Sequence, residues 1–201
     1  IGDTSGFRRM EGIIVPGTYD LGGENLEYWI NEWINGAERR YERYAAEDYE
    51  KNDLSASEQI ILASIVEGDT NLVDSYEDTV AAVYLNRVKS NEKFGSFPTV
   101  AYALGYQRPY LTAEDTKVNS PYNTYEHKGL PPGPIGCFGD ESLKASLEKA
   151  DSDLHFFFYE YVKREILSFV SYADFKAAGK ESKELFEATF EISRFEKMAD
   201  K

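Results

Sequence analysis

Two carboxylates follow a strongly apolar stretch of the chain. Residues 60–66 read Ile-Ile-Leu-Ala-Ser-Ile-Val, and Glu67, Gly68 and Asp69 come directly after them. A helix that is apolar on nearly every side is typical of the middle of a domain. Apolar surroundings raise the pKa of a carboxyl group, which can then act as a general acid near neutral pH. Asp69 is therefore a candidate acid, and a surface or capping role is the alternative.

A proline-rich loop over residues 109–134 is the second candidate region. Five of the seven prolines lie in it, so it is expected to be stiff and ordered, because each proline fixes φ near −65°. Between the prolines stand polar and aromatic side chains suited to a polyhydroxylated ligand, namely Tyr122, Asn123, Thr124 and Tyr125. The alternative is a structural loop whose aromatic rings pack on the core.

Composition excludes several classes of function. The chain has 201 residues and a net charge of −14, which argues against binding to nucleic acid. One cysteine and two histidines disfavour a disulfide framework, a thiolate metal site and a His-rich zinc site. No run of about 20 apolar residues is present in the sequence, so this chain is not expected to span a bilayer itself.

The apolar periodicity predicts mostly helices. A long helix is expected over residues 24–48, interrupted at Gly36, and Ser55 with Glu58 forms a capping-box pattern at the start of the next helix. Further expected elements are a helix from residue 76 or 78 with Tyr84 on its apolar face, a short segment over 97–102, a helix over 141–150, a hairpin of two strands over 154–161 and 165–170, a turn or short helix over 171–176, and an amphipathic helix over 181–198.

These elements predict an α+β fold class: a helix-dominated single domain with a small β-sheet and a Pro-rich cleft loop. The expected organisation is a leading segment over residues 1–20, a main domain over 21–176, and a C-terminal amphipathic helix over 177–201 that packs on or extends this domain.

Several motifs in register resemble the MltG/YceG-like family of endolytic murein transglycosylases. They are Leu62–Glu67, Val80–Val88, Pro98–Tyr102, Ser120–Tyr125 and Gly129–Ile135, and the segment Glu11–Tyr19 resembles the start of the family's catalytic domain. The resemblance spans about residues 10–175. It implies cleavage of MurNAc–GlcNAc bonds in nascent peptidoglycan to give 1,6-anhydroMurNAc ends, without a metal or organic cofactor.

The same resemblance implies a place and partners. Family members are bacterial and membrane-anchored, so we expect the extracytoplasmic face of the cell membrane, with an anchor outside this sequence. The expected partners are peptidoglycan glycan strands and cell-wall synthesis proteins.

In the transglycosylase reaction that the resemblance implies, one carboxyl group acts first as acid on the glycosidic oxygen and then as base towards the C6 hydroxyl of the sugar.

The chain departs from the family pattern at the catalytic motif. Where the family reads Glu-Lys-Glu, with the second Glu as the acid, this chain reads Glu67-Gly68-Asp69. Asp69 is one methylene shorter, and a displacement of about 1 Å can cost ~100-fold in rate. This chain also has Gly95, Phe97 and Leu167 at positions where the family has polar residues. Two hypotheses stay open: a lytic transglycosylase of reduced activity, or an inactive glycan-binding or scaffold relative.

The candidate catalytic residues are Asp69, as the acid, and Glu67, for which a structural bond to the Pro-rich loop or a solvated helix end is favoured. Gly68 could break the helix and redirect both side chains. Candidate substrate-binding residues are Asn86, Arg87, Thr99, Tyr102, Tyr122, Asn123, Thr124 and Tyr125. For Asn86 and Arg87, hydrogen bonds to carbonyls of the Pro-rich loop are favoured over substrate contact.

Overall fold

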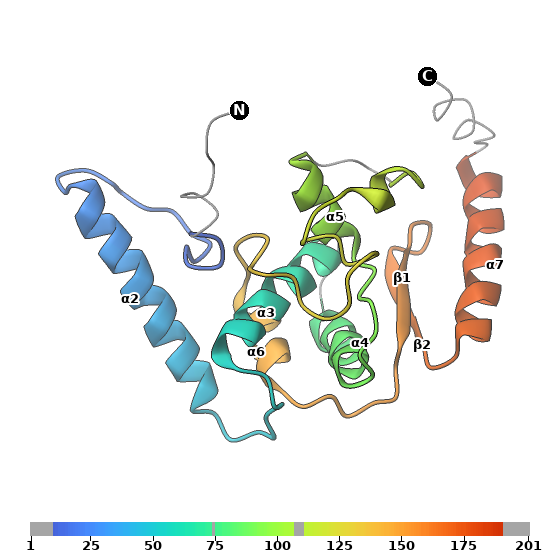
Figure 1. Cartoon of the computed structure of the whole chain (residues 1–201), viewed down its shortest axis with the longest axis horizontal. Coiled ribbons are helices and arrows are strands. Elements are labelled where there is room, and N and C mark those ends of the chain that lie inside the picture. Colours follow the sequence, from blue (N-terminus) through green and yellow to red (C-terminus); the bar gives the residue numbers. More distant parts are fainter. Residues whose placement is uncertain (1–9, 74, 107–110, 191–201) are drawn as a thin grey trace.

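A central group of helices is flanked on one side by a long helix and on the other by a β-hairpin and a further helix (Figure 1). The computed structural model describes residues 10–73, 75–106 and 111–190. Its elements are α2 (Leu26–Ala45), α3 (Ala56–Thr70), α4 (Glu77–Lys89), α5 (Phe97–Leu104), the 3₁₀ turn η1 (Asp115–Lys117), α6 (Asp140–Leu147), β1 (Phe156–Glu160), β2 (Glu165–Phe169) and α7 (Tyr172–Phe190). The predicted fold class, α+β and helix-dominated, is confirmed.

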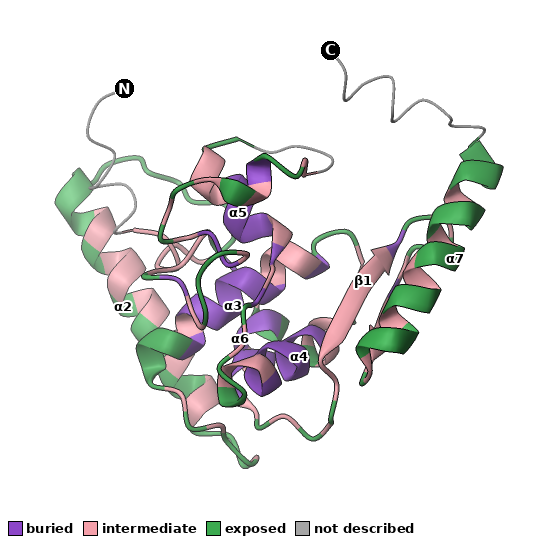
Figure 2. Ribbon diagram, turned by 45° about the vertical axis from the view of Figure 1, so that its right-hand side comes forward, coloured by how far each residue is buried: buried purple, intermediate pink, exposed green. Residues whose placement is uncertain are grey.

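Helix α3 lies at the centre of the core. The predicted capping box is present: Ser55 Oγ accepts the Glu58 N–H, and Glu58 Oε2 accepts the Ser55 N–H at 2.9 Å. Leu62 and Ile65 are completely buried. Helices α4 and α6 pack on α3, and Figure 2 places the most buried residues on this central group. The apolar stretch is therefore a core helix, as its sequence predicts, and it carries Asp69 on its last turn.

Gly68 lies inside α3 and does not break it. The helix runs on to Thr70, so the predicted break is wrong. A Cβ atom at Gly68 would stand 2.7 Å from Cβ of Pro98 and 2.9 Å from its Cγ. The absence of a side chain thus lets α5 approach α3 closely. Residues 97–102, predicted as a short segment, are the first turns of α5, with Pro98 in the first turn and Gly105 at φ +78° as the C-cap.

The predicted hairpin is present, with Phe156 paired to Phe169 and Glu160 to Glu165 in antiparallel register. Alternate residues of β1 face opposite sides. Phe158 contacts Phe175 of α7, at 5.8 Å between ring centroids, whereas Phe157 contacts Tyr84 of α4 at 5.5 Å. The hairpin is therefore a layer between α7 and the central helices.

Other boundaries differ from the prediction in detail. Helix α2 continues through Gly36, because a helix tolerates an isolated glycine at a modest cost. Helix α6 ends at Leu147 rather than 150. The turn predicted over 171–176 is the start of α7, which is anchored by Phe175 on the hairpin, and the predicted continuation to residue 198 lies partly outside the described residues. None of the described helices is long and apolar enough to cross a membrane.

Candidate active site

The carboxyl group of Asp69 lies between three segments of the chain. Its Oδ2 accepts a hydrogen bond from the Tyr84 hydroxyl of α4 at 2.6 Å and another from Ser96 Oγ at 2.9 Å, just before α5. Asp69 is half-buried, and Tyr84 and Ser96 are almost completely buried. The last turn of α3, the middle of α4 and the start of α5 thus meet at this carboxyl group.

Burial raises the pKa of Asp69 from 3.8 to about 6. The hydrogen bonds from Tyr84 and Ser96 and the charge of Arg87 lower this pKa, but they offset the effect of burial only in part. With a pKa near 6, roughly a tenth of Asp69 carries its proton at pH 7. This acidity suits a group that must give up a proton and then accept one near neutral pH.

Ser96 is held in place by two buried threonines. Its N–H donates to Thr124 Oγ1 at 3.0 Å, and its carbonyl accepts the Thr99 hydroxyl at 2.8 Å. The two threonine hydroxyl oxygens lie 2.7 Å apart. Gly95, at φ +59°, forms the turn that precedes Ser96, and its N–H donates to the Thr124 carbonyl. Thr99 and Thr124, predicted to bind substrate, are buried and fix the Ser96 backbone.

Tyr84 is fixed by aromatic neighbours on two sides. The Phe94 ring stacks on it, with centroids 4.6 Å apart and planes inclined by 19°. Phe157 of β1 meets it edge-on. Sequence reasoning placed Tyr84 on the apolar face of its helix and gave Ser96 no role. Since these residues lie 15 and 27 positions from Asp69, no local pattern joins them to it.

One aromatic residue of the Pro-rich loop, Tyr125, lies close to this carboxyl group. Burial raises the pKa of the Tyr125 phenol, and the negative charge of Asp69 raises it further, which places Tyr125 within electrostatic reach of Asp69. The Tyr122 and Tyr102 rings pack together with centroids 4.8 Å apart. All three predicted binding tyrosines are half-buried. Residue 109, where the predicted loop begins, lies outside the described residues.

Asn123 is completely buried inside the loop. Its amide nitrogen donates to the carbonyls of Thr116 and Val118, and its Oδ1 accepts the Tyr125 N–H at 3.1 Å. Its hydrogen-bonding groups are engaged within the loop, so the side chain shapes the path of the chain that carries Tyr122 and Tyr125.

Asn86 and Arg87 bind carbonyl groups, but not those of the Pro-rich loop. Asn86 Nδ2 donates to the carbonyls of Ser152 and Leu154. Arg87 donates to the His155 carbonyl at 2.6 and 2.8 Å, and to that of Phe94. The predicted loop partner is therefore wrong, because α4 turns this face towards the segment that leads into β1.

Glu67 points away from Asp69. Its Oε2 accepts the Gly139 N–H at 2.9 Å and the Ser142 hydroxyl at 2.7 Å, which places a negative charge at the N-terminus of α6. The predicted bond to the Pro-rich loop is corrected to a bond with this helix start. Residues two apart on a helix point ~200° apart, so Glu67 and Asp69 serve different neighbours.

The three residues that stand where the family pattern has polar residues do not share one environment in the structure. Gly95 forms the turn before Ser96, and Phe97 begins α5 half-buried. Leu167 pairs with Phe158 across the hairpin. Paired residues share a face of the sheet, and Phe158 faces α7, so Leu167 lies on the side of the hairpin opposite Phe157 and Tyr84.

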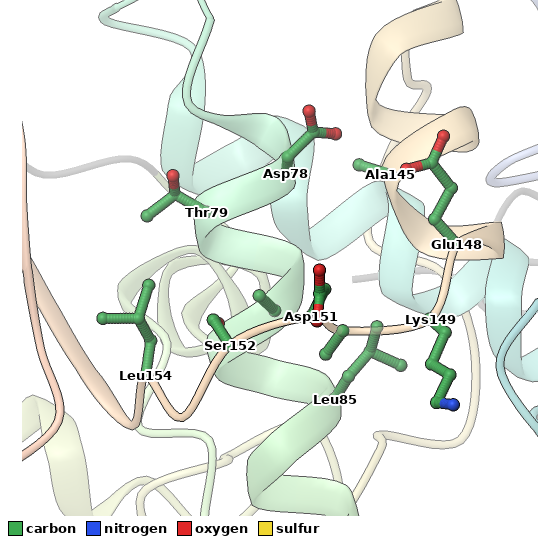
Figure 3. Close-up of a pocket in the computed structure, with 11 residues that line it drawn as sticks. Asp78, Thr79, Leu85, Ala145, Glu148, Lys149, Asp151, Ser152 and Leu154 are labelled. Atoms are coloured by element: carbon green, nitrogen blue, oxygen red, sulfur yellow. The ribbon is translucent and has the colours of Figure 1, made fainter. Parts of the chain in front are cut away.

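A separate pocket of about 250 Å³ lies between α4, α6 and the segment before β1 (Figure 3). Asp78, Glu148 and Asp151 are among its lining residues, whereas Asp69 is not. Throughout the described ranges, no group of three or more His, Cys, Asp or Glu side chains is arranged to hold a metal ion.

This geometry defines a class of protein: a helix-dominated α+β domain whose central helix ends at a carboxyl group of raised pKa. The model of the YceG-like family matches residues 3–181, and the chain belongs to this family. The predicted resemblance is thereby confirmed.

Named relatives support the same membership. An endolytic murein transglycosylase of Bacillus subtilis (strain 168) is 33% identical over 151 residues, which cover 74% of this chain and 41% of that protein. One from Streptococcus pneumoniae (strain D39) is 27% identical over 161 residues, which cover 77% of this chain and 29% of that protein. The chain thus spans less than half the length of these curated relatives. A crystal structure of a YceG-like protein from Listeria monocytogenes has a TM-score of 0.72 at 28% identity, covering 84% of this chain and 55% of that one.

Proposed function

We propose that this chain is the catalytic domain of an endolytic peptidoglycan lytic transglycosylase. It cleaves MurNAc–GlcNAc bonds within glycan strands and leaves 1,6-anhydroMurNAc ends. The observation that carries the proposal is the carboxyl group of Asp69, held by two hydrogen bonds and with a pKa raised to about 6. The resemblance of the motifs to the family implies that Asp69 stands at the position of the family acid. The names of the B. subtilis and S. pneumoniae relatives support the choice of substrate.

The proposed reaction needs one carboxyl group. Protonated Asp69 gives its proton to the glycosidic oxygen as the bond from C1 of MurNAc to that oxygen breaks. The C6 hydroxyl oxygen of the same sugar then bonds to C1 and passes its proton to the Asp69 carboxylate. The acid is regenerated, and no water is consumed. A pKa near 6 lets the same group act in both directions near neutral pH.

The surrounding residues divide into two proposed roles. Tyr102, Tyr122 and Tyr125 are the proposed sugar contacts, since each is half-buried and Tyr125 is within electrostatic reach of Asp69. Aromatic side chains offer an apolar face together with a polar hydroxyl. The predicted contacts whose polar groups are engaged inside the protein are proposed to maintain the site: Asn86, Arg87, Thr99, Asn123 and Thr124.

The proposed setting is the extracytoplasmic face of a bacterial membrane, with an anchor outside this sequence. Peptidoglycan glycan strands are the proposed substrate, and cell-wall synthesis proteins the proposed partners. Activity is proposed to be lower than that of a glutamate enzyme, because Asp69 reaches one methylene less far into the substrate site.

The test is digestion of uncrosslinked peptidoglycan strands, with products identified by mass spectrometry. We expect internal cleavage with anhydro ends from the parent, and a loss of at least about 100-fold in Asp69→Asn, which cannot donate the proton. Asp78→Asn is the control, because Asp78 is an exposed carboxylate on α4 that lines the separate pocket.

Three outcomes would overturn parts of the proposal. Equal product from Asp69→Asn and the parent would remove Asp69 as the acid. Anhydro ends from Asp69→Glu alone would mean a competent substrate site with an aspartate too short to work. Strands that stay intact with all variants, yet bind the parent domain, would favour the inactive glycan-binding alternative.

A further inference from the structure

The two hydrogen bonds on Asp69 fall on the same oxygen. Tyr84 and Ser96 both donate to Oδ2, at 2.6 and 2.9 Å. Oδ1 accepts no hydrogen bond from any residue that the structure describes. The carboxyl group is therefore asymmetric: one oxygen accepts two hydrogen bonds, and the other accepts none from the described residues.

We infer that Tyr84 and Ser96 are positioning residues that orient the Asp69 carboxyl group and direct its transferable proton to Oδ1. A carboxylate oxygen has about two lone-pair sites, and on Oδ2 both have a donor. A proton on Oδ2 would have to displace Tyr84 or Ser96, so the protonated acid carries it on Oδ1. The inference deepens the proposed function and rests on it for the role of that proton.

Both donors are held in place before any substrate binds. The Tyr84 ring lies between Phe94 and Phe157, and its exposed fraction is 1%. Ser96 is equally buried, and its backbone is fixed by Thr99 and Thr124. An aspartate has only two side-chain torsions, so two fixed donors on one oxygen leave the carboxyl plane little freedom. Such preorganisation maintains the reactive geometry of an acid with a short side chain.

The charged and titratable groups around Asp69 come from the elements packed on it. Arg87 and Tyr84 belong to α4, and Tyr125 to the Pro-rich loop. Arg87 favours the ionised carboxylate by its charge, and the two donors favour it by hydrogen bonding. Removing a donor while Arg87 and Tyr125 stay in place should therefore weaken Asp69 as an acid.

The experiment uses Tyr84→Phe and Ser96→Ala in the whole chain, with two measurements. Carbon NMR of the Asp69 carboxyl carbon gives its pKa without any substrate. We expect the acid dissociation constant to fall roughly tenfold in each variant, the usual scale for one lost charge-assisted hydrogen bond. Tyr41→Phe is the matched control, since it removes a tyrosine hydroxyl that donates to Gln59 Oε1 at 2.7 Å instead of to Asp69.

The second measurement is the pH profile of anhydro-product formation. The basic limb of kcat/KM should move to higher pH in both variants, because Asp69 keeps its proton longer. kcat should fall by about 10- to 100-fold with little change in KM, as expected for lost orientation of the acid. If Tyr84 and Ser96 made only structural contacts, the substitutions would lower the stability of the protein without moving the basic limb of the kcat/KM profile.

The outcomes separate this inference from the proposed function. If neither variant changes the carboxyl pKa or the pH profile, the inference is overturned. If the pKa changes as expected but the parent releases no anhydro ends, Tyr84 and Ser96 do control Asp69, and the proposed reaction fails instead.

Discussion

At the scale of the residue, Asp69 combines features that normally oppose each other. Enclosure by the protein disfavours its charge, whereas Tyr84, Ser96 and Arg87 favour it, and burial has the larger effect. Above its pKa the folded protein must hold a poorly solvated anion. A carboxyl group of this kind is therefore expected to reduce the stability of the fold at neutral pH.

The first prediction concerns pH and stability. The folded-state pKa of Asp69, about 6, lies above its ordinary value of 3.8, so the folded state binds this proton more tightly than the unfolded state. The resulting stabilisation is complete below pH 3.8 and is lost as pH rises through about 6. The Asp69→Asn variant has no carboxyl group to ionise here, so its stability does not fall in this way as pH rises. Its amide oxygen can still accept the hydrogen bonds from Tyr84 and Ser96.

Asp69→Asn should therefore be more stable than the parent at pH 7, by up to about 3 kcal/mol, and nearly equal to it near pH 4. Urea unfolding of both proteins at pH 4, 5, 6 and 7 measures this difference. A difference that is constant across these pH values, or that grows towards pH 4, would contradict the assignment of the raised pKa.

At the scale of the element, the contact between α3 and α5 connects the packing of the two helices to the position of Ser96. Gly68 admits the Pro98 ring, and α5 carries Thr99, which bonds the Ser96 carbonyl. A small displacement of α5 would thus move a donor of Asp69. Glycine at position 68, beside Asp69, therefore has a packing role in this fold.

The second prediction is that Gly68→Ala destabilises the protein although alanine favours helices. The new methyl group would stand 2.7 Å from a rigid ring carbon of Pro98. Overpacking costs about 1–3 kcal/mol, which exceeds the roughly 0.5–1 kcal/mol gained in helix propensity. Thermal unfolding should show a lower Tm, with a parallel loss of anhydro product.

Gly36→Ala provides the matched control for this change. A Cβ atom at Gly36 in α2 would meet nothing within 4 Å, so the same substitution should stabilise by about 0.5–1 kcal/mol. If both alanines raised the Tm equally, close packing of α3 on α5 would not be the reason for glycine at position 68.

At the scale of the whole molecule, two lateral parts flank the central helices (Figure 2). Helix α2 lies on one side and has no buried residue, whereas the hairpin with α7 lies on the other. The hairpin side is connected to the site by Phe157 on Tyr84 and by Arg87, which binds carbonyls on both sides of this junction. The stability of this junction should therefore affect Asp69.

The third prediction is that Arg87→Lys weakens the junction while keeping the charge. A lysine ammonium cannot reproduce the planar fork that binds the His155 and Phe94 carbonyls together. We expect a loss of about 2 kcal/mol in urea unfolding and faster hydrogen exchange over residues 152–160. Arg43→Lys is the control, with a side chain 61% exposed and an expected change within about 0.5 kcal/mol. Equal effects of the two substitutions would contradict this role of Arg87.

Local patterns in the sequence determined much of the fold. The apolar run before Glu67 predicted the core helix, Ser55 and Glu58 predicted its start, and two short segments rich in apolar and aromatic residues predicted the hairpin. These predictions hold because helix periodicity, capping and strand alternation depend on residues close in sequence. The same reasoning placed Asp69 at the end of an apolar helix, where a raised pKa is expected.

Only the tertiary structure decided which groups surround that carboxyl. Tyr84 and Ser96 meet Asp69 from 15 and 27 residues away, and Thr124 fixes Ser96 from 28 residues away. Glu67 bonds to the start of α6, and Asn86 and Arg87 bond to carbonyls before β1, where local pattern gave no indication. The sequence by itself determined which segments form helices and strands and where an acid lies among apolar residues. Packing decided which polar groups meet, because hydrogen-bond partners are set by how helices approach one another in space.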